Sequence, residues 1–529
     1  MSGGPVSEEY LMAWRRIVSI VCIGGMLQGC ASTRRLDGGD AQQPDTTSSA
    51  STAVVLSPTQ LRADFDQAIG YITAVAVHAD LNARRFGIDY PRELAALRAQ
   101  ITDSTDVCTF ARLLDKALNL VLDLHAGTMS YEYLRAYGTL QSRFNISEDE
   151  DYASVAALER QCPVAPPALM LPVEFIDGHY VVYADVAVRG TVVPRGTWIT
   201  SYNGEEIASF IRRHLTQVRP VQVDQGGTVY SLRFYRAGEP AFRLGLSDGR
   251  ELALRLDDSV TWQVPRTHDI TYFSQPRPRV LHFAEQRTLY IGIPMMDEDV
   301  VEGITASIDS LVRAGATIER IAIDIRGNGG GSDLTWRRVV SHLVDRDLAF
   351  ALDLRMKDNP LTRGRYPRQP RPEATPIALL GGVPYWVHND DVVTFGPDST
   401  SLRFQGPIYV LRDRYIYSSA GNFADFASQD PQFTTVGAPT DLVGGAQIEP
   451  LFFRLDHSGI VFRLEPALDF SGVRTLDDFA HNTVEVTITP SVEDLFLRST
   501  FAGDIYDRDF LLEHDPLFRY VVARPPQVR

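Results

Sequence analysis

Residues 318–333 read Ile-Glu-Arg-Ile-Ala-Ile-Asp-Ile-Arg-Gly-Asn-Gly-Gly-Gly-Ser-Asp, and they are the most informative stretch of this 529-residue chain. The apolar run from Ile321 to Ile325 predicts a buried strand. After it come Gly329, Gly330 and Gly331, which adopt positive φ easily and leave their N–H groups uncovered by side chains. Such a turn can direct amide donors at a developing negative charge, as acyl transfer requires. Phosphate-binding loops and ordinary tight turns look alike, so the turn alone assigns no function.

A second informative segment follows about ninety residues later. Residues 406–411 form another apolar run, and after a short polar stretch the sequence continues Tyr417-Ser418-Ser419-Ala420-Gly421. The spacing of the apolar residues beyond predicts a helix. A serine at a strand-to-helix turn is where a nucleophile becomes exposed, close to a helix N-terminus. The alternative is that Ser418 only caps that helix.

Together the two segments resemble the tail-specific, or C-terminal processing, serine peptidases and their tricorn-like relatives. That family carries a strand ending in D-L-R-x-N-x-G-G and a nucleophile segment of the type T-x-S-x-A-E, which correspond here to residues 324–330 and 416–421. The resemblance implies Ser418 as nucleophile, with Ser419 as the fallback. It also implies that the oxyanion donors are the N–H groups of Gly329, Gly330 and Ser419. The implied substrate-binding residues are Gly331 and Gln447.

A serine nucleophile needs a base. The processing-protease branch of the family uses a lysine, but its position here holds Val443, and no lysine follows Lys357. The tricorn-like branch uses a histidine in a motif like L-x-D-G-H-T, which resembles Leu-Asp-Leu-His-Ala-Gly-Thr at residues 122–128. His125 is therefore the implied base, because a neutral imidazole suits this role at neutral pH. The alternative is a histidine that caps the end of a helix.

The acidic residue that orients the histidine is the weakest part of the pattern. Tricorn-like relatives place a carboxylate near G-V-x-P-D-I-x-V, and the nearest match here, residues 482–489, points to Glu485. Asp477, Asp478 and Asp123 are the alternatives. Gly421 also replaces the glutamate that usually follows the nucleophile. These departures leave two functions open besides a serine-type peptidase acting through an acyl-enzyme: a catalytically inactive peptide-binding lipoprotein of the cell envelope, and an esterase.

The N-terminus has the features of a secretory signal. Two arginines precede the apolar run Ile17–Leu27, and Leu27-Gln28-Gly29-Cys30 resembles a bacterial lipobox. The resemblance implies cleavage before Cys30, lipidation of its thiol and a membrane anchor, with the protein at the outer membrane facing the periplasm. Residues 31–57 are polar and predict a disordered tether.

The resemblance also implies the fold class, an α/β protein with a crotonase-like (ClpP/crotonase) catalytic domain. Residues 193–207 resemble the signature of PDZ-like modules, in which Gly196 and Asn203-Gly204 need positive φ. The predicted segments are a signal peptide (1–29), a tether (30–57), a helical domain (58–163), a β-rich PDZ-like module (164–270), the catalytic domain (271–500) and a C-terminal tail (501–529).

Composition restricts the partners. A formal net charge of −16 argues against nucleic acid as a partner. The resemblance to the tail-specific peptidases implies a peptide or protein substrate instead. Few cysteines and unclustered histidines predict neither a metal site nor a cofactor. Cys108 and Cys162 are able to pair in an oxidising compartment, but sequence alone does not decide whether they do.

Overall fold

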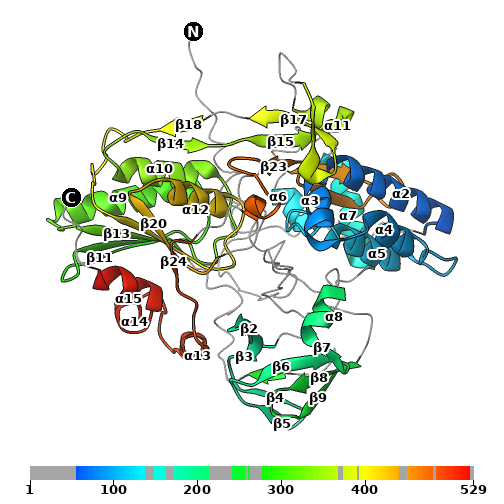
Figure 1. Cartoon of the computed structure of the whole chain (residues 1–529), viewed down its shortest axis with the longest axis horizontal. Helices are drawn as coiled ribbons and strands as arrows, with labels where there is room; N and C mark the ends of the chain where they lie inside the picture. Colours follow the sequence, from blue (N-terminus) through cyan, green and yellow to red (C-terminus); the bar gives the residue numbers. More distant parts are fainter. Residues whose placement is uncertain are drawn as a thin grey trace, which may run out of the picture.

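The central feature of the computed structural model is a six-stranded sheet with helices on both faces (Figure 1). The structure describes residues 55–136, 148–162, 171–213, 241–255, 260–262, 277–366, 373–389, 392–439, 450–480 and 484–524. The strands lie in the order β11 (Arg279–Phe283), β12 (Thr288–Gly292), β13 (Arg320–Asp324), β19 (Ile408–Arg412), β20 (Phe433–Gly437) and β24 (Val486–Thr487). Only β11 and β12 pair antiparallel, and the remaining neighbours are parallel. Both informative segments of the sequence therefore leave adjacent parallel strands at the same edge.

Alternating residues of the strands bury the two faces of this sheet. Ile321 and Ile323 face one core, which α9 (Asp299–Arg313), α10 (Asp333–Leu343) and α12 (Ser419–Gln429) cover. Ala322 between them faces a second core. This two-residue period, with both faces buried, explains why β13 is apolar throughout apart from its two ends.

The C-terminal residues are not a tail. Residues 508–513 form α14 and residues 516–523 form α15, and both helices cover the second face of the sheet (Figure 1). Leu517, Phe518 and Val521 are buried there against Tyr290 and Tyr409. The predicted boundary at residue 500 is therefore wrong, because the last helices supply apolar side chains that one face of the sheet needs.

The predicted N-terminal helical region consists of α2 (Pro58–Val75), α3 (Val77–Phe86), α4 (Tyr90–Arg98), α5 (Val107–Asn119), α6 (Tyr131–Ala136) and α7 (Glu148–Gln161). Its core is completed from elsewhere in the chain. The hairpin of β21 (Leu451–Arg454) and β22 (Val461–Leu464) buries Leu451, Phe462 and Leu464 among these helices. Asp64 of α2 accepts the N–H groups of His457 and Ser458 at the tip of that hairpin. Helices and hairpin thus form one unit.

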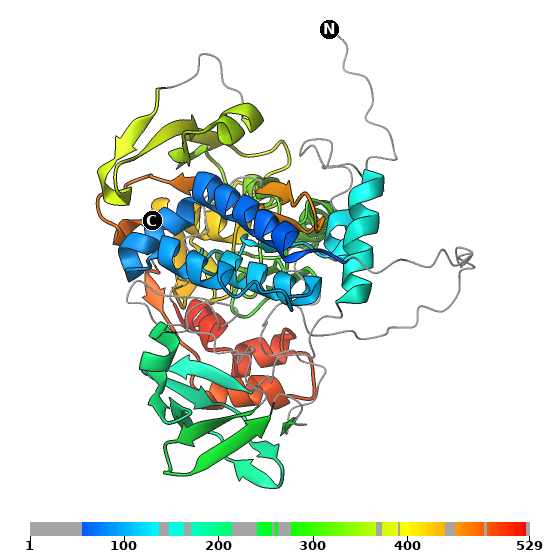
Figure 2. The same ribbon diagram turned by 90° about the vertical axis from the view of Figure 1, so that its right-hand side faces the viewer.

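The β-rich module lies below the N-terminal helices in the view of Figure 2. It contains a sheet in the order β2 (Val173–Ile176), β3 (His179–Val182), β6 (Trp198–Tyr202), β8 (Ala241–Leu246) and β9 (Glu251–Arg255). A second sheet pairs β4 (Val186–Val188) with β5 (Thr191–Val193) and β10 (Val260–Trp262). Helix α8 (Ile207–Arg213) packs beside them. The positive φ predicted at Gly196, Asn203 and Gly204 is confirmed.

Several predictions fall outside the described residues. They are the signal peptide, most of the tether, the lipidation site at Cys30, the substrate-binding role of Gln447 and the lysine position held by Val443. Within the part of the chain that the structure describes, no helix combines the length and the apolar character needed to cross a bilayer.

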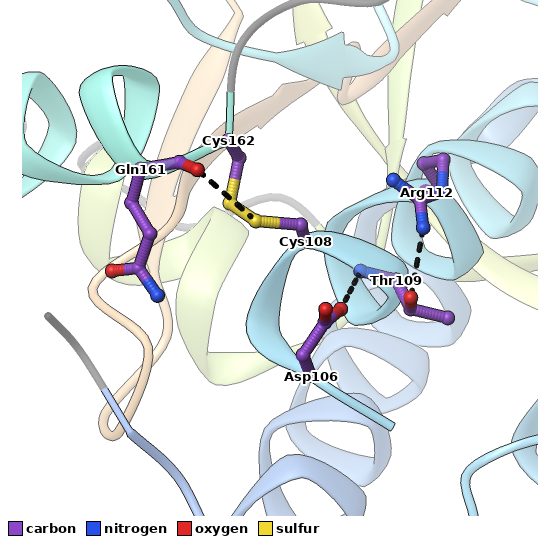
Figure 3. The surroundings of a disulfide bond; sticks show 6 residues. All are labelled: Asp106, Cys108, Thr109, Arg112, Gln161 and Cys162. Atoms are coloured by element: carbon purple, nitrogen blue, oxygen red, sulfur yellow. Dashed lines mark hydrogen bonds between the residues drawn. A yellow bond between two sulfur atoms is a disulfide. The ribbon is translucent and has the colours of Figure 1, made fainter. Parts of the chain in front are cut away.

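A disulfide joins Cys108 on α5 to Cys162 just beyond α7 (Figure 3). Asp106 caps α5 by accepting the N–H of Thr109 at 2.7 Å, which fixes the first turn of the helix that carries Cys108. The bond closes a segment with a sequence separation of 54 residues. It resolves the pairing that the sequence left open.

Replacing both cysteines by serine should lower the free energy of unfolding by about 4 kcal/mol, because a long loop in the unfolded chain is no longer closed. Urea unfolding of the double variant and of the wild type, each with and without reductant, measures this. Reductant should destabilise only the wild type. In a form with Cys22 and Cys30 replaced by alanine, two titratable thiols in the denatured, unreduced protein would contradict the assignment.

Candidate active site

The glycine turn is anchored by buried charges at the end of β13. Asp324 accepts the Arg326 side chain through both carboxylate oxygens, at 2.6 to 3.1 Å, and also accepts the Tyr290 hydroxyl at 2.7 Å. Arg326 in turn donates to Asp515 at the start of α15 at 2.7 Å. Because these groups are buried and satisfy one another, the strand end cannot move without exposing an unpaired charge.

Asn328 fixes the turn itself. Its side chain donates to the Ile293 carbonyl at 2.9 Å and accepts the N–H of Gly330 at 2.8 Å. Its own carbonyl accepts the N–H of Tyr417 at 3.0 Å. This last bond joins the two segments that the sequence predicted to act together.

Ser418 lies directly against this turn. A Cβ built on Gly330 would be 2.6 Å from the Cβ of Ser418 and 2.7 Å from the Tyr417 carbonyl oxygen. Gly330 also has a φ of +102°, so the position needs glycine on both grounds. The prediction that the two segments meet in space is confirmed.

The backbone of Ser418 is strained. Its φ of 52° and ψ of −126° lie outside the left-handed helical region, which has ψ near +47°. Ser418 occupies the N-cap position of α12, but its side chain makes no capping hydrogen bond. A helix cap therefore does not explain this serine. Strained non-glycine residues at strand-to-helix turns are typical of exposed nucleophiles.

Ser419 differs from Ser418 in its surroundings. It belongs to α12 and is 2% exposed, whereas Ser418 is half-buried. The N–H groups of Ser419 and Gly329 make no hydrogen bond to any other described residue, so both are available as donors. The N–H of Gly330 is bonded to Asn328, and this bond excludes the predicted role of Gly330 as an oxyanion donor. Gly331 packs on the Met296 backbone, away from Ser418.

His125 lies in the turn that follows α5, beyond the helix end at Asn119. Its ring packs against the ring of Tyr417, with centroids 4.8 Å apart. The structure thus brings His125 beside the residue that precedes Ser418, across 293 positions of sequence (418 − 125). No direct hydrogen bond joins the His125 and Ser418 side chains.

The carboxylate beside His125 is Glu465, which the sequence analysis missed. Its Oε2 lies 3.2 Å from Nδ1 of His125, and Glu465 is 1% exposed. The pairing of β1 (Gly127–Thr128) with β22 explains this arrangement, because Gly127 pairs with Arg463 in antiparallel register. In an antiparallel pair, the residue two positions before Gly127 lies opposite the residue two positions after Arg463. The register therefore places His125 opposite Glu465.

The acids predicted from the sequence have other partners. Glu485 accepts the N–H of Thr435 at 2.7 Å and the hydroxyl of the same residue, beside β20. Asp478 accepts the N–H groups of Arg474 and Thr475, and Asp477 lies in the same short 3-10 helix. The prediction of Glu485 as the partner of His125 is therefore replaced by Glu465. The signal present in the sequence was an acidic residue followed by proline directly after an apolar strand, at residues 461–466.

Buried charges surround His125. Burial lowers the pKa of His125 to about 3, with Asp123 opposing this change and Arg463 and His78 reinforcing it. The imidazole is consequently neutral at pH 7 and able to accept a proton. Burial raises the pKa of Asp123, but His78, His125 and the Tyr417 hydroxyl together hold it below its ordinary value. Asp123 therefore stays ionised.

Among the described residues, no group of three or more side chains is placed to hold a metal ion.

The arrangement suits a serine hydrolase: His125 packs on Tyr417, the neighbour of Ser418, and Ser418 lies beside uncovered amide donors on an α/β domain. Residues 287–473 match the family model described as peptidase family S41. This range contains Ser418, Glu465 and the glycine turn, so the match supports a peptidase. No curated protein matches the chain in sequence.

Two solved structures of CPAF share the fold. A mutant of CPAF aligns with a TM-score of 0.53 at 12% identity, covering 88% of this chain and 98% of its own. Mature CPAF aligns with a TM-score of 0.50 at 12% identity, covering 84% and 95%. The photosystem II D1 C-terminal processing protease aligns at 14% identity with a TM-score of 0.36, covering 83% and 96%. At such identities the CPAF matches show a common fold and nothing finer.

Gly330→Ala should lower the free energy of unfolding by about 1–3 kcal/mol, because the new Cβ has no room and φ is unfavourable for alanine. Gly303→Ala is the matched control. Gly303 is exposed on α9 with nothing within 4 Å of a built Cβ, so alanine should stabilise by about 0.5–1 kcal/mol. Urea unfolding measures both. Equal stability of the two variants would contradict the close packing of the glycine turn on Ser418.

Proposed function

We propose that the protein is a serine-type peptidase that cleaves peptides or proteins through an acyl-enzyme on Ser418, with His125 as the base and Glu465 as its acidic partner. The observation that carries the proposal is the pairing of a buried, neutral His125 with Glu465 beside the strained turn of Ser418. Strain without a capping bond favours Ser418 over Ser419. The match to peptidase family S41 supports the reaction class.

The chemistry follows the general serine-hydrolase scheme. Nε2 of His125 takes the proton of the Ser418 hydroxyl as Oγ attacks the scissile carbonyl carbon. The resulting oxyanion accepts the N–H groups of Gly329 and Ser419. Loss of one such donor costs on the order of 3 kcal/mol in the barrier. His125 then protonates the departing amine, and a water activated by the same imidazole hydrolyses the ester. Glu465 at Nδ1 stabilises the imidazolium in both steps.

The second candidate is a catalytically inactive peptide-binding protein, and the departures at Val443 and Gly421 favour it. The loss of lysine at Val443 does not disable a site whose base is His125. Gly421 lies in the first turn of α12, and an acidic residue there is not required by the pairing of His125 with Glu465. The peptidase is therefore the better supported of the two candidates.

Ser418→Ala and His125→Ala should each abolish turnover. Ser418→Ala should leave the thermal midpoint nearly unchanged because Ser418 is half-buried, whereas His125→Ala should lower it because a buried ring beside Glu465 is lost. Labelling of the full chain by a fluorophosphonate probe measures nucleophile reactivity without a known substrate. Ser419→Ala is the matched control and should still be labelled. A wild type that binds peptides and stays unlabelled would establish the inactive candidate. A wild type that is labelled but cleaves only esters would establish an esterase.

Glu465→Gln should reduce kcat by a factor on the order of 10² to 10⁴, because the imidazolium loses its compensating charge. Glu485→Gln removes a carboxylate of equal size that binds Thr435 instead, so kcat should change little while stability falls by about 1 kcal/mol. Steady-state kinetics on any peptide that the wild type cleaves compares the two. The reverse order of effects would restore Glu485 as the acid.

We also propose an anchored location in the cell envelope, on the lipobox-like Leu27–Cys30 segment alone. The Cys108–Cys162 disulfide supports an oxidising compartment. Incorporation of a labelled fatty acid by the wild type, and its loss in Cys30→Ala, tests the anchor. Absence of label from the wild type would refute it.

A further inference from the structure

We propose that Tyr417 is a positioning residue of this hydrolase site, whose hydroxyl acts through Asp123 to hold His125 in place relative to Ser418. The inference rests on the proposed function. It extends that function to Tyr417 and Asp123, two residues that the family motifs do not link to each other.

Tyr417 contacts all three parts of the site. Its N–H donates to Asn328 of the glycine turn at 3.0 Å, and its ring packs on the His125 ring. Its hydroxyl donates to Oδ1 of Asp123 at 2.6 Å. Because Ser418 is the next residue in the chain, each of these contacts also fixes the nucleophile.

Asp123 receives two donors on one oxygen. Oδ1 accepts the Tyr417 hydroxyl and, at 3.1 Å, the backbone N–H of His125. The same atom therefore ties the segment of the base to the segment of the nucleophile. A buried carboxylate must be compensated, and here His78, the base His125 and the Tyr417 hydroxyl compensate it.

Charged groups face His125 from several segments. Asp123 precedes it in the same turn, and Glu465 follows β22. Arg463 of β22 and His78 of α3 contribute charge from the other sides, and Nδ1 of His78 lies 3.9 Å from Oδ2 of Asp123. The Tyr417 hydroxyl withdraws part of the Asp123 charge from His125. Removing the Tyr417 hydroxyl should thus raise the pKa of His125, whereas removing the Asp123 charge should lower it.

A purely structural role for Tyr417 would be met equally well by phenylalanine, which keeps the ring against His125. The positioning role needs the Tyr417 hydroxyl and the purely structural role does not, so removing the hydroxyl distinguishes the two. Tyr415 supplies a matched control, since it is equally buried, lies two residues earlier and donates to a different carboxylate, Oε2 of Glu174, at 2.5 Å.

The experiment compares Tyr417→Phe, Tyr415→Phe and Asp123→Asn in the full chain by the rate of fluorophosphonate labelling, from pH 2 to pH 9, a range that includes the pKa of His125 of about 3. Tyr417→Phe should label about tenfold to a hundredfold more slowly at saturating probe, with unchanged probe affinity, as expected for a lost bond to a charged group. Tyr415→Phe should label like the wild type, because Arg414 still binds Glu174 at 2.6 Å and keeps this segment in place. The acid limb should move to higher pH in Tyr417→Phe and to lower pH in Asp123→Asn, because Asp123 favours protonated His125.

Wild-type labelling rates in Tyr417→Phe, or acid limbs that move in the same direction in both variants, would overturn the inference and leave the proposed function intact. A wild type that the probe does not label would overturn the proposed function and the inference together. Should Tyr417→Phe not fold, Asp123→Asn decides, because asparagine keeps an acceptor oxygen for both donors. Because that variant loses only the charge, an acid limb unchanged from the wild type would refute the role.

Discussion

The site depends on a two-residue antiparallel pairing between β1 and β22. Gly127 and Thr128 come from the N-terminal helical region. Phe462 and Arg463 come from the hairpin of β21 and β22, which lies between β20 and β24 in the sequence. Without this register, Glu465 would not lie opposite His125. The pairing is short, but the hairpin is buried among the helices through Leu451, Phe462 and Leu464, so it is fixed by packing over a much larger surface than its own hydrogen bonds.

A second constraint acts between the two strand ends. β13 and β19 are neighbouring parallel strands, so the turns that follow them emerge side by side. In open α/β sheets this edge is where ligands bind. Here the close approach is achieved because Gly330 has no side chain, and the approach is maintained because Asn328 accepts the N–H of Tyr417. The strain at Ser418 is therefore held by hydrogen bonds and packing on both sides of the serine.

Local chemistry made much of this predictable. The strand before the glycines and the helix beyond Ser418 follow from short-range patterns, and the structure confirms them. Glu465 was not predictable in the same way, because its role arises from a register between segments more than 300 residues apart. Glu485 matched a motif position, yet its carboxylate serves the backbone of β20. The C-terminal helices were missed because their apolar faces are short and are buried only by packing against the sheet.

Buried carboxylates restrain the segment before the nucleophile from two sides. Glu174 of β2, whose pKa burial raises, accepts Arg414 at 2.6 Å and Tyr415 at 2.5 Å, while Asp123 accepts Tyr417. The first carboxylate belongs to the β-rich module and the second to the helical region. A pocket lined by Glu174, Arg414 and Tyr415 lies on the module side and does not include Ser418 or His125. Because charge pairs tolerate little displacement when buried, a shift of either unit must be transmitted to residues 414–417. The geometry of Ser418 is thus a property of three units rather than of the catalytic sheet alone.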